Sequence, residues 1–316
     1  MKATVSIIIP IYNRATIIPK TLDSIQVQTY ECWECILVDD GSTDDTLSVL
    51  ERYKKSDARF KIYKRPESVE KGANGCRNYG FSVATGDYIN WFDSDDLMFA
   101  NFLEVKLNSF TNTLDAVIHK NVYANYKLNT YRDSKFDYDN GKSLFYNYAM
   151  ETIELQTCCF MWRRTFLNDK SLFDPKISRY QDNEFHIRML ALPNLNIKIL
   201  EEVLAVIRSG NGHETQISST SKLTKQKLYD VFYYRYQCLQ LAKHNGFADE
   251  VFNRTLAKKS LWAFYAALKY ETRFIKRVKD LKLYYKRLIF IYLNPQMHFK
   301  DIIISHLYLL KIVFSN

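Results

Sequence analysis

Short apolar strands alternate with helical stretches over the first hundred residues, and this alternation narrows the choice of fold more than any other feature. Residues 5–11 form an almost continuous run of branched apolar side chains, as a strand buried on both faces requires. The pattern predicts further strands at 33–38, 60–63 and 88–92, and helices at about 17–26, 43–55 and 73–84. Such a series predicts an α/β fold with a mostly parallel sheet flanked by helices.

Polar residues directly follow three of these strands. Tyr12-Asn13 follows the first, Asp39-Asp40 the second, and Asp93-Ser94-Asp95-Asp96 the fourth. Ligands of parallel sheets bind beyond the carboxyl ends of the strands, so we expect these residues at one edge. Mutually repelling carboxylates suit Mg²⁺ or Mn²⁺, which completes its shell with water and substrate phosphates. The alternative is that Asp93 to Asp96 only begin a helix over residues 97–107.

Other classes of phosphate-handling enzyme, and a zinc site, agree less well with the sequence motifs. The first strand is followed neither by Gly-x-Gly-x-x-Gly nor by Gly-x-x-x-x-Gly-Lys, which disfavours dinucleotide dehydrogenases and P-loop enzymes. A phosphatase with an aspartyl nucleophile stays conceivable, but its Asp-x-Asp is expected on the first strand. The pair Cys32 and Cys35 lacks further ligands at zinc spacing, so we expect packed thiols there and at Cys158-Cys159.

Positive charge is concentrated in the last third of the chain. Residues 222–316 carry 18 Lys/Arg and 6 Asp/Glu, a net +12, whereas the rest of the chain is at −3. Apolar residues at helical spacing predict amphipathic helices there, with the basic residues between them. Attraction to an anionic membrane surface is one interpretation and a merely solvated helix surface is the other. No nucleic-acid partner is expected.

The N-terminal apolar run is short, contains Pro10 and has no small-residue cleavage site, which indicates a strand and not a signal peptide. The longest later apolar stretch, at 302–314, is interrupted by polar residues and is too short to span a bilayer. We therefore expect a cytoplasmic protein, with contact at the inner face of the cell membrane as a further expectation.

Taken in order, these segments resemble the family 2 glycosyltransferases, inverting enzymes of the GT-A fold. The family's Pro-x-Tyr-Asn segment is matched by Pro10 to Asn13, and its Val-Asp-Asp-Gly-Ser-Thr-Asp segment by Val38 to Asp44. The resemblance implies that Tyr12 packs on the nucleotide base and that Asp40 accepts a hydrogen bond from it. It further implies a nucleotide-binding Arg77 in Cys76-Arg77-Asn78, and an Asp-x-Asp element in which Asp93, with Ser94, lies near the ribose and Asp95 holds the metal.

The resemblance extends to a candidate base. Residues 180–185 resemble the family's Glu-Asp element before a helix with an arginine, here Arg188, and the resemblance implies that Asp182 is the general base. Gln181 departs from the glutamate that is common at its position. Glu184 is the rival base, and acidic residues that merely favour a helix N-terminus are the alternative for both.

The match covers roughly residues 1–215, so we expect a GT-A domain over 1–215 and a basic helical C-terminal region over 216–316. Residues 208–218 resemble the family's arginine-containing loop, where His213 is a candidate metal ligand or phosphate contact, although a surface histidine is the alternative.

The implied function is metal-dependent transfer of a sugar, with inversion, from a nucleoside diphosphate donor to a hydroxyl of a glycan or lipid-linked acceptor. We expect a uridine diphosphate sugar, while guanosine and thymidine donors stay open. Two alternatives stay open: a nucleotide- or phosphate-processing enzyme with the same metal carboxylates, and a non-catalytic nucleotide-sugar binding protein of the same fold.

Overall fold

The computed structural model describes residues 2–209, 224–270 and 274–292. They form two compact units, each assembled from separate stretches of the chain. Unit 1 takes its described residues from Met1–Phe136, Glu154–Pro175 and Pro193–Glu214. Unit 2 takes its described residues from Asp137–Ile153, Lys176–Leu192 and Thr215–Asn316. The boundary predicted near residue 215 falls outside the described residues and stays a prediction.

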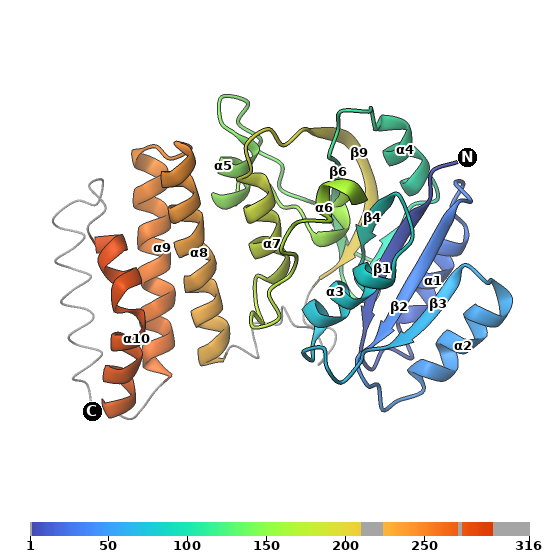
Figure 1. Cartoon of the computed structure of the whole chain (residues 1–316), viewed down its shortest axis with the longest axis horizontal. Helices are drawn as coiled ribbons and strands as arrows, with labels where there is room; N and C mark the ends of the chain where they lie inside the picture. Colours follow the sequence, from blue (N-terminus) through green and yellow to red (C-terminus); the bar gives the residue numbers. More distant parts are fainter. Residues whose placement is uncertain (1, 210–223, 271–273, 293–316) are drawn as a thin grey trace. The chain divides into compact units, whose positions relative to one another are not determined.

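Unit 1 is built on one curved sheet with the strand order β3-β2-β1-β4-β8-β6-β9-β5, and β7 pairs with β6 (Figure 1). The strands are β1 (Val5–Ile11), β2 (Trp33–Asp39), β3 (Phe60–Lys64), β4 (Tyr88–Trp91), β5 (Leu97–Met98), β6 (Ala116–Ala124), β7 (Tyr131–Asp133), β8 (Phe160–Arg163) and β9 (Ile197–Arg208). The first four strands are parallel, as predicted, whereas β8, β5 and β7 add antiparallel pairs. The predicted α/β class is confirmed.

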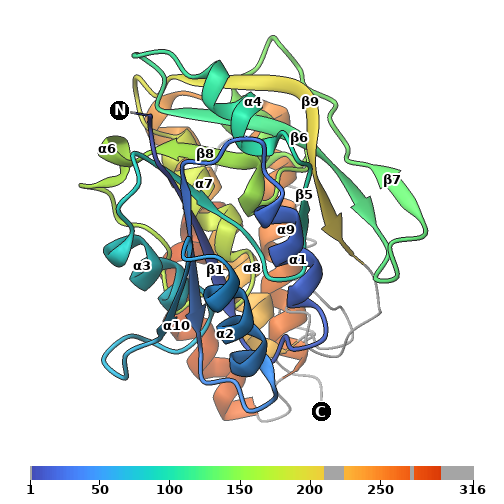
Figure 2. The same cartoon turned by 90° about the vertical axis from the view of Figure 1, so that its right-hand side faces the viewer.

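Helices cover both faces of the parallel half of the sheet. They are α1 (Ile18–Gln26), α2 (Thr46–Ser56) and α3 (Ala73–Val83), whereas α4 (Phe102–Ser109) lies against β6 and β9, and α6 (Arg164–Leu167) lies against β8. In Figure 2, β1 lies between α3 on one side and α1 and α2 on the other, as right-handed crossovers in this strand order require. Gly80 lets α3 approach β1 closely, because a Cβ at this position would lie 2.4 Å from Cγ2 of Ile8.

The strand ends bring the predicted residues to one edge. Ile11 of β1 pairs with Asp39 of β2, and Ile8 pairs with Trp91 of β4. Residues that directly follow β1, β2 and β4 therefore emerge side by side. One alternative is wrong: Leu97 and Met98 form β5 against β9, and the next helix begins only at Phe102, so Asp93 to Asp96 are not a helix N-terminus.

Unit 2 is helical. It comprises α5 (Leu144–Ala149), α7 (Gln181–Leu190), α8 (Lys225–Asn245), α9 (Glu250–Lys269) and α10 (Phe274–Tyr292), the last three running side by side in Figure 1. The amphipathic helices predicted for this region are confirmed, since their apolar faces are buried and their rings are in contact. The ring centroid of Phe232 lies 5.2 Å from that of Phe264 and 5.6 Å from that of Tyr284.

Over the residues that the structure describes, none of the helices has the length and apolar character needed to cross a bilayer. The apolar stretch at 302–314 lies outside the described residues.

Candidate active site

The loops after β1 and β2 are bonded to each other. Asn13 adopts a left-handed backbone with φ 53°, its N–H donates to Oγ of Ser42 at 2.9 Å, and its Oδ1 accepts from the N–H of Thr43 at 2.8 Å. The carboxylate of Asp39 accepts from the N–H groups of Gly41 and Ser42 at 3.1 and 3.2 Å. Asn13 and Asp39 therefore hold the two loops in their conformation at this edge of the sheet.

Asp40 and Tyr12 contact residues that line a hollow, Arg65 and Lys71 respectively. Asp40 is buried, pairs with Nε of Arg65, and accepts the N–H of Gly72 at 2.9 Å. Residues 65 and 67–71 line a hollow of about 400 Å³. The ring of Tyr12 is 42% exposed, and Nζ of Lys71 lies 5.3 Å from its centroid. The region thus offers a flat ring and a buried carboxylate close to one loop.

Arg77 links α3 to the carboxylates that follow β4. It is buried, donates to Oδ1 of Asp93 at 2.8 Å and to Oδ1 of Asn74 at 3.1 Å, and stands 5.2 Å from the Phe173 ring. Because the guanidinium has a fixed planar geometry, these contacts set the position of the Asp93 carboxylate.

The remaining acidic residues of this cluster repel one another. Burial and the charge of Asp93 raise the pKa of Asp95, although Arg14 and Arg208 act against that rise. Burial and the charges of Asp95 and Asp93 raise the pKa of Asp96 well above its usual range, even though Asp96 accepts the N–H of Arg208 at 2.9 Å. The cluster is thus an unfavourable concentration of negative charge that a cation would relieve.

The carboxylate oxygens of Asp93, Asp95 and Asp96 suit a hard divalent ion that is held by only one or two protein ligands. Asp93 is about one-third exposed and Asp95 is half-buried, whereas Asp96 is buried against β9. Within the described ranges these three do not form a group whose ligand atoms all lie within 4.8 Å of one another. Mg²⁺ and similar ions are commonly bound by one or two carboxylates together with substrate phosphates, which this arrangement permits. His213 falls outside the described residues.

Ser94 is part of the loop's framework. It is buried, its Oγ accepts from Nε of Arg14 at 3.2 Å, and its carbonyl accepts from the hydroxyl of Thr21 at 3.1 Å. Pro10 is buried within β1. Sequence reasoning overlooked Arg14 and Arg65. Arg14 follows the first strand closely, so its position after a strand end could have identified it. The sequence near Arg65 contains no signal that it pairs with Asp40.

The candidate bases lie in unit 2, in the first turn of α7. Asp182 is half-buried, whereas Glu184 is buried and accepts two hydrogen bonds from Arg188, at 2.7 and 3.0 Å. Glu184 is therefore engaged in an ion pair within its own helix, and Asp182 as the general base stays a prediction.

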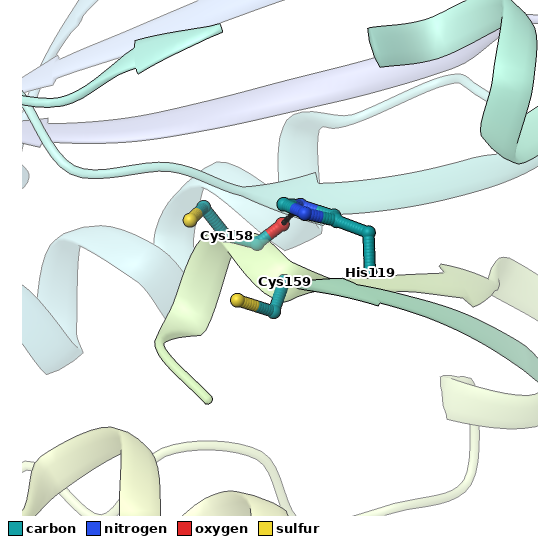
Figure 3. A group of neighbouring side chains, drawn as sticks. All are labelled: His119, Cys158 and Cys159. Atoms are coloured by element: carbon teal, nitrogen blue, oxygen red, sulfur yellow. Dashed lines mark hydrogen bonds between the residues drawn. The ribbon is translucent and has the colours of Figure 1, made fainter. Parts of the chain in front are cut away.

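A second group with metal-binding side chains lies in the core of unit 1. His119, Cys158 and Cys159 place their ligand atoms within 4.8 Å of one another (Figure 3). The ring of His119 is already engaged, with Nδ1 2.6 Å from the Lys120 carbonyl and Nε2 3.3 Å from that of Cys158. Burial raises the pKa of the Cys158 thiol well above its usual range, which opposes the thiolate that a metal needs. Both cysteines are buried and neither is in a disulfide, as predicted.

The strand order and the carboxylates after β4 define the GT-A class of fold. Staphylococcus aureus TarS, solved with UDP-GlcNAc, has this fold, with a TM-score of 0.68 at 17% identity over 98% of this chain and 88% of that one. A Pyrobaculum calidifontis mannosyltransferase, solved with GDP-Man and Mn²⁺, has a TM-score of 0.56 at 16% identity over 99% and 86%.

Sequence comparison identifies the family. The sequence model of the family Glycosyl transferase family 2 matches residues 6–174, which is more than half of the chain. This chain therefore belongs to that family, as the motifs predicted. Among its relatives is the Escherichia coli UDP-Glc:alpha-D-GlcNAc-diphosphoundecaprenol beta-1,3-glucosyltransferase WfgD, 32% identical over 165 residues, or 52% of this chain. The match spans 62% of WfgD and 15% of a Rickettsia bellii glycosyltransferase, less than two thirds of either relative.

Proposed function

We propose that this chain is a metal-dependent inverting glycosyltransferase, which moves a sugar from a nucleoside diphosphate donor to a hydroxyl of a glycan or lipid-linked acceptor. The observation that carries this proposal is the cluster of Asp93, Asp95 and Asp96 with the arginines 14, 77 and 208 around it. The mutual repulsion of these carboxylates favours a metal ion, and the nearby guanidinium groups favour the diphosphate that the ion accompanies.

The donor that we propose is a uridine diphosphate sugar. Tyr12 offers an exposed ring for stacking, and Asp40 offers a carboxylate for a base N–H beside the hollow at residues 65–71. The names of WfgD and of the TarS complex point to uridine donors, whereas the mannosyltransferase complex holds GDP-Man. Titration with UDP, GDP and TDP decides: equal affinity for all three would remove Asp40 from base recognition.

The roles of the chain's residues follow from their chemistry. Asp95 would hold Mn²⁺ or Mg²⁺, which when bound stabilises the charge of the departing diphosphate, and Asp93 would lie near the ribose. Arg77 orients Asp93, and Arg14 and Arg208 favour negative charge at this edge. We assign Asp182 as the general base that takes the proton of the acceptor hydroxyl. One displacement from the face opposite the diphosphate inverts the anomeric centre.

The test is a turnover assay with a panel of nucleotide sugars, candidate acceptors and Mn²⁺, read as released nucleoside diphosphate. Turnover should vanish in chelator, in Asp95→Ala and in Asp182→Asn. Full turnover in Asp182→Asn would indicate a nucleotide- or phosphate-processing enzyme that needs no acceptor base. Tight nucleotide binding without turnover on any donor would indicate a binding protein.

We also propose that unit 2 contacts the inner face of the cell membrane peripherally, where lipid-linked acceptors are presented. On α10, Leu283 is 73% exposed and lies among lysines, while the helix's one acidic residue, Asp280, pairs with Lys225 at 2.5 Å. Each basic residue near an anionic surface contributes about 1 kcal/mol of attraction. The exposed lysines are Lys276, Lys279, Lys282 and Lys286.

A further inference from the structure

The backbone immediately before α7 is held in an unfavourable conformation. Tyr180 has φ 59° and ψ 33°, the left-handed region that side chains other than glycine rarely adopt, and the helix begins at the next residue. A non-glycine residue stays in that region only where its surroundings impose it, and such positions concentrate at functional sites. Asp182 lies two residues further on, so the position of Tyr180 sets how the first turn of α7 begins.

A carboxylate from α8 holds this turn. Asp230 is buried, and its Oδ2 accepts from the N–H of Ser178 at 2.8 Å, from the Ser178 hydroxyl at 2.6 Å and from the N–H of Arg179 at 3.1 Å. Its Oδ1 accepts from Nε2 of Gln226 at 2.9 Å. Three donors from two consecutive residues converge on one oxygen, which fixes the chain direction just before Tyr180.

The side chain of Tyr180 is fixed as well. Its ring stacks on Tyr234 of α8 with centroids 5.0 Å apart, and its hydroxyl donates to Oε1 of Glu151 at 3.3 Å. Glu151 is itself paired with Lys259 at 2.8 Å and Arg235 at 3.6 Å. Burial alone would raise the pKa of Glu151, but these two cations lower it, so its carboxylate is ionised and can accept this bond.

From these contacts we propose that Asp230 is a positioning residue, which acts through the 178–180 turn to aim Asp182 for proton transfer. The inference rests on the proposed function and extends it, because it makes the basic helical region a part of the catalytic apparatus as well as a membrane contact. General bases lose efficiency steeply when misplaced by about 1 Å, so loosening this turn lowers turnover without touching the donor.

The experiment uses the full chain and compares Asp230→Ala with Asp249→Ala. Asp249 is a matched control, since it too is an acidic residue of the helical unit that caps backbone, at Phe252 N–H, and pairs with Lys142, but it makes none of the 178–180 contacts. Asp230→Ala should lower kcat about 10- to 100-fold while the Kd for UDP with Mn²⁺ changes less than about 2-fold. Asp230→Asn, which retains an acceptor oxygen, should recover most of kcat, and Asp249→Ala should keep it.

Hydrogen exchange at the amides of residues 178–182 measures how firmly the turn is held, independently of turnover. These amides should exchange faster in Asp230→Ala than in the wild type and Asp249→Ala. Equal exchange in all three proteins, or equal loss of kcat in both alanine variants, overturns the inference while leaving the proposed function intact. Absence of turnover in the wild type, or full turnover in Asp182→Asn, overturns the proposed function itself and reduces Asp230 to a structural contact.

Discussion

Lys106 of α4 is fully buried and offers a direct test of the electrostatics of this core. Its Nζ donates to Oδ1 of Asn90 at 2.7 Å and to the Cys158 carbonyl at 2.9 Å, and it lies 4.0 Å from the Phe102 ring centroid. No carboxylate is paired with it among the described residues. Burial lowers the pKa of Lys106 from 10.5 to about 7.

The shift makes stability depend on pH. Because the folded pKa is below the unfolded one, the unfolded chain binds the additional proton between pH 7 and 10.5, and stability contributed by this site rises with pH across that window. A difference of about 3.5 units corresponds to a penalty of roughly 5 kcal/mol below pH 7. About 2 kcal/mol of it disappears between pH 7 and pH 9.

The measurement is urea unfolding of the wild type and Lys106→Met at pH 7 and pH 9. The free energy of unfolding of the wild type, taken relative to the variant, should rise by about 2 kcal/mol from pH 7 to pH 9. The lost hydrogen bonds add an offset that is the same at both pH values, so only the change with pH is diagnostic. Lys54→Met on the exposed face of α2 is the control. A difference between wild type and Lys106→Met that does not change with pH would refute the reasoning.

Three further predictions concern packing, donor binding and the membrane. Gly80→Ala should destabilise by about 1–3 kcal/mol in urea unfolding, since the new methyl meets Ile8, whereas Ser82→Ala on the same helix should not; equal stabilities would contradict this. Asp40→Ala should weaken UDP binding at least about 10-fold by calorimetry, with exposed Asp45→Ala unchanged, and an unaltered Kd would count against Asp40. The protein should co-sediment with anionic vesicles at low salt and be released at high salt. Replacing the four exposed lysines of α10 by glutamine should abolish this, and equal binding to neutral vesicles would rule out the electrostatic contact.

The first half of unit 1 could be predicted closely from the sequence, because its strands are short apolar runs whose burial alone determines them. The strand β1 has the predicted bounds, and β2 extends the prediction only by Asp39. The alternative of a helix over residues 97–107 failed at Leu97 and Met98, which form a strand because they pair with Val206 and Ala205. A partner more than a hundred residues away leaves no trace in the local pattern.

The candidate site, too, was predictable where local sequence determines it and not where distant partners do. Periodicity and strand ends sufficed to propose that Asp40, Asp93 and Asp95 share an edge, since the loops after neighbouring parallel strands emerge on the same side of the sheet. The partners of those residues were not predictable: Arg65 reaches Asp40 from a different loop, and the left-handed backbone of Tyr180 depends on contacts from α8. Side-chain partners across the fold, unlike strand order, are determined by packing that no single segment encodes.

We expect Asp95 to lower the stability of the metal-free protein while serving metal binding. The stability of an Asp95 variant therefore distinguishes a metal site from a purely structural cluster. Burial and Asp93 raise its pKa, so its ionised form destabilises the metal-free protein. Asp95→Asn removes one charge at nearly the same volume and should raise stability by about 0.5–2 kcal/mol in chelator. Mn²⁺ with UDP should raise the melting temperature of the wild type and have much less effect on the variant, since binding to the native state alone stabilises it. Exposed Asp45→Asn should behave as the wild type in both conditions. A structural cluster gives the opposite result: Asp95→Asn would melt lower than the wild type in chelator, and Mn²⁺ with UDP would shift both proteins equally.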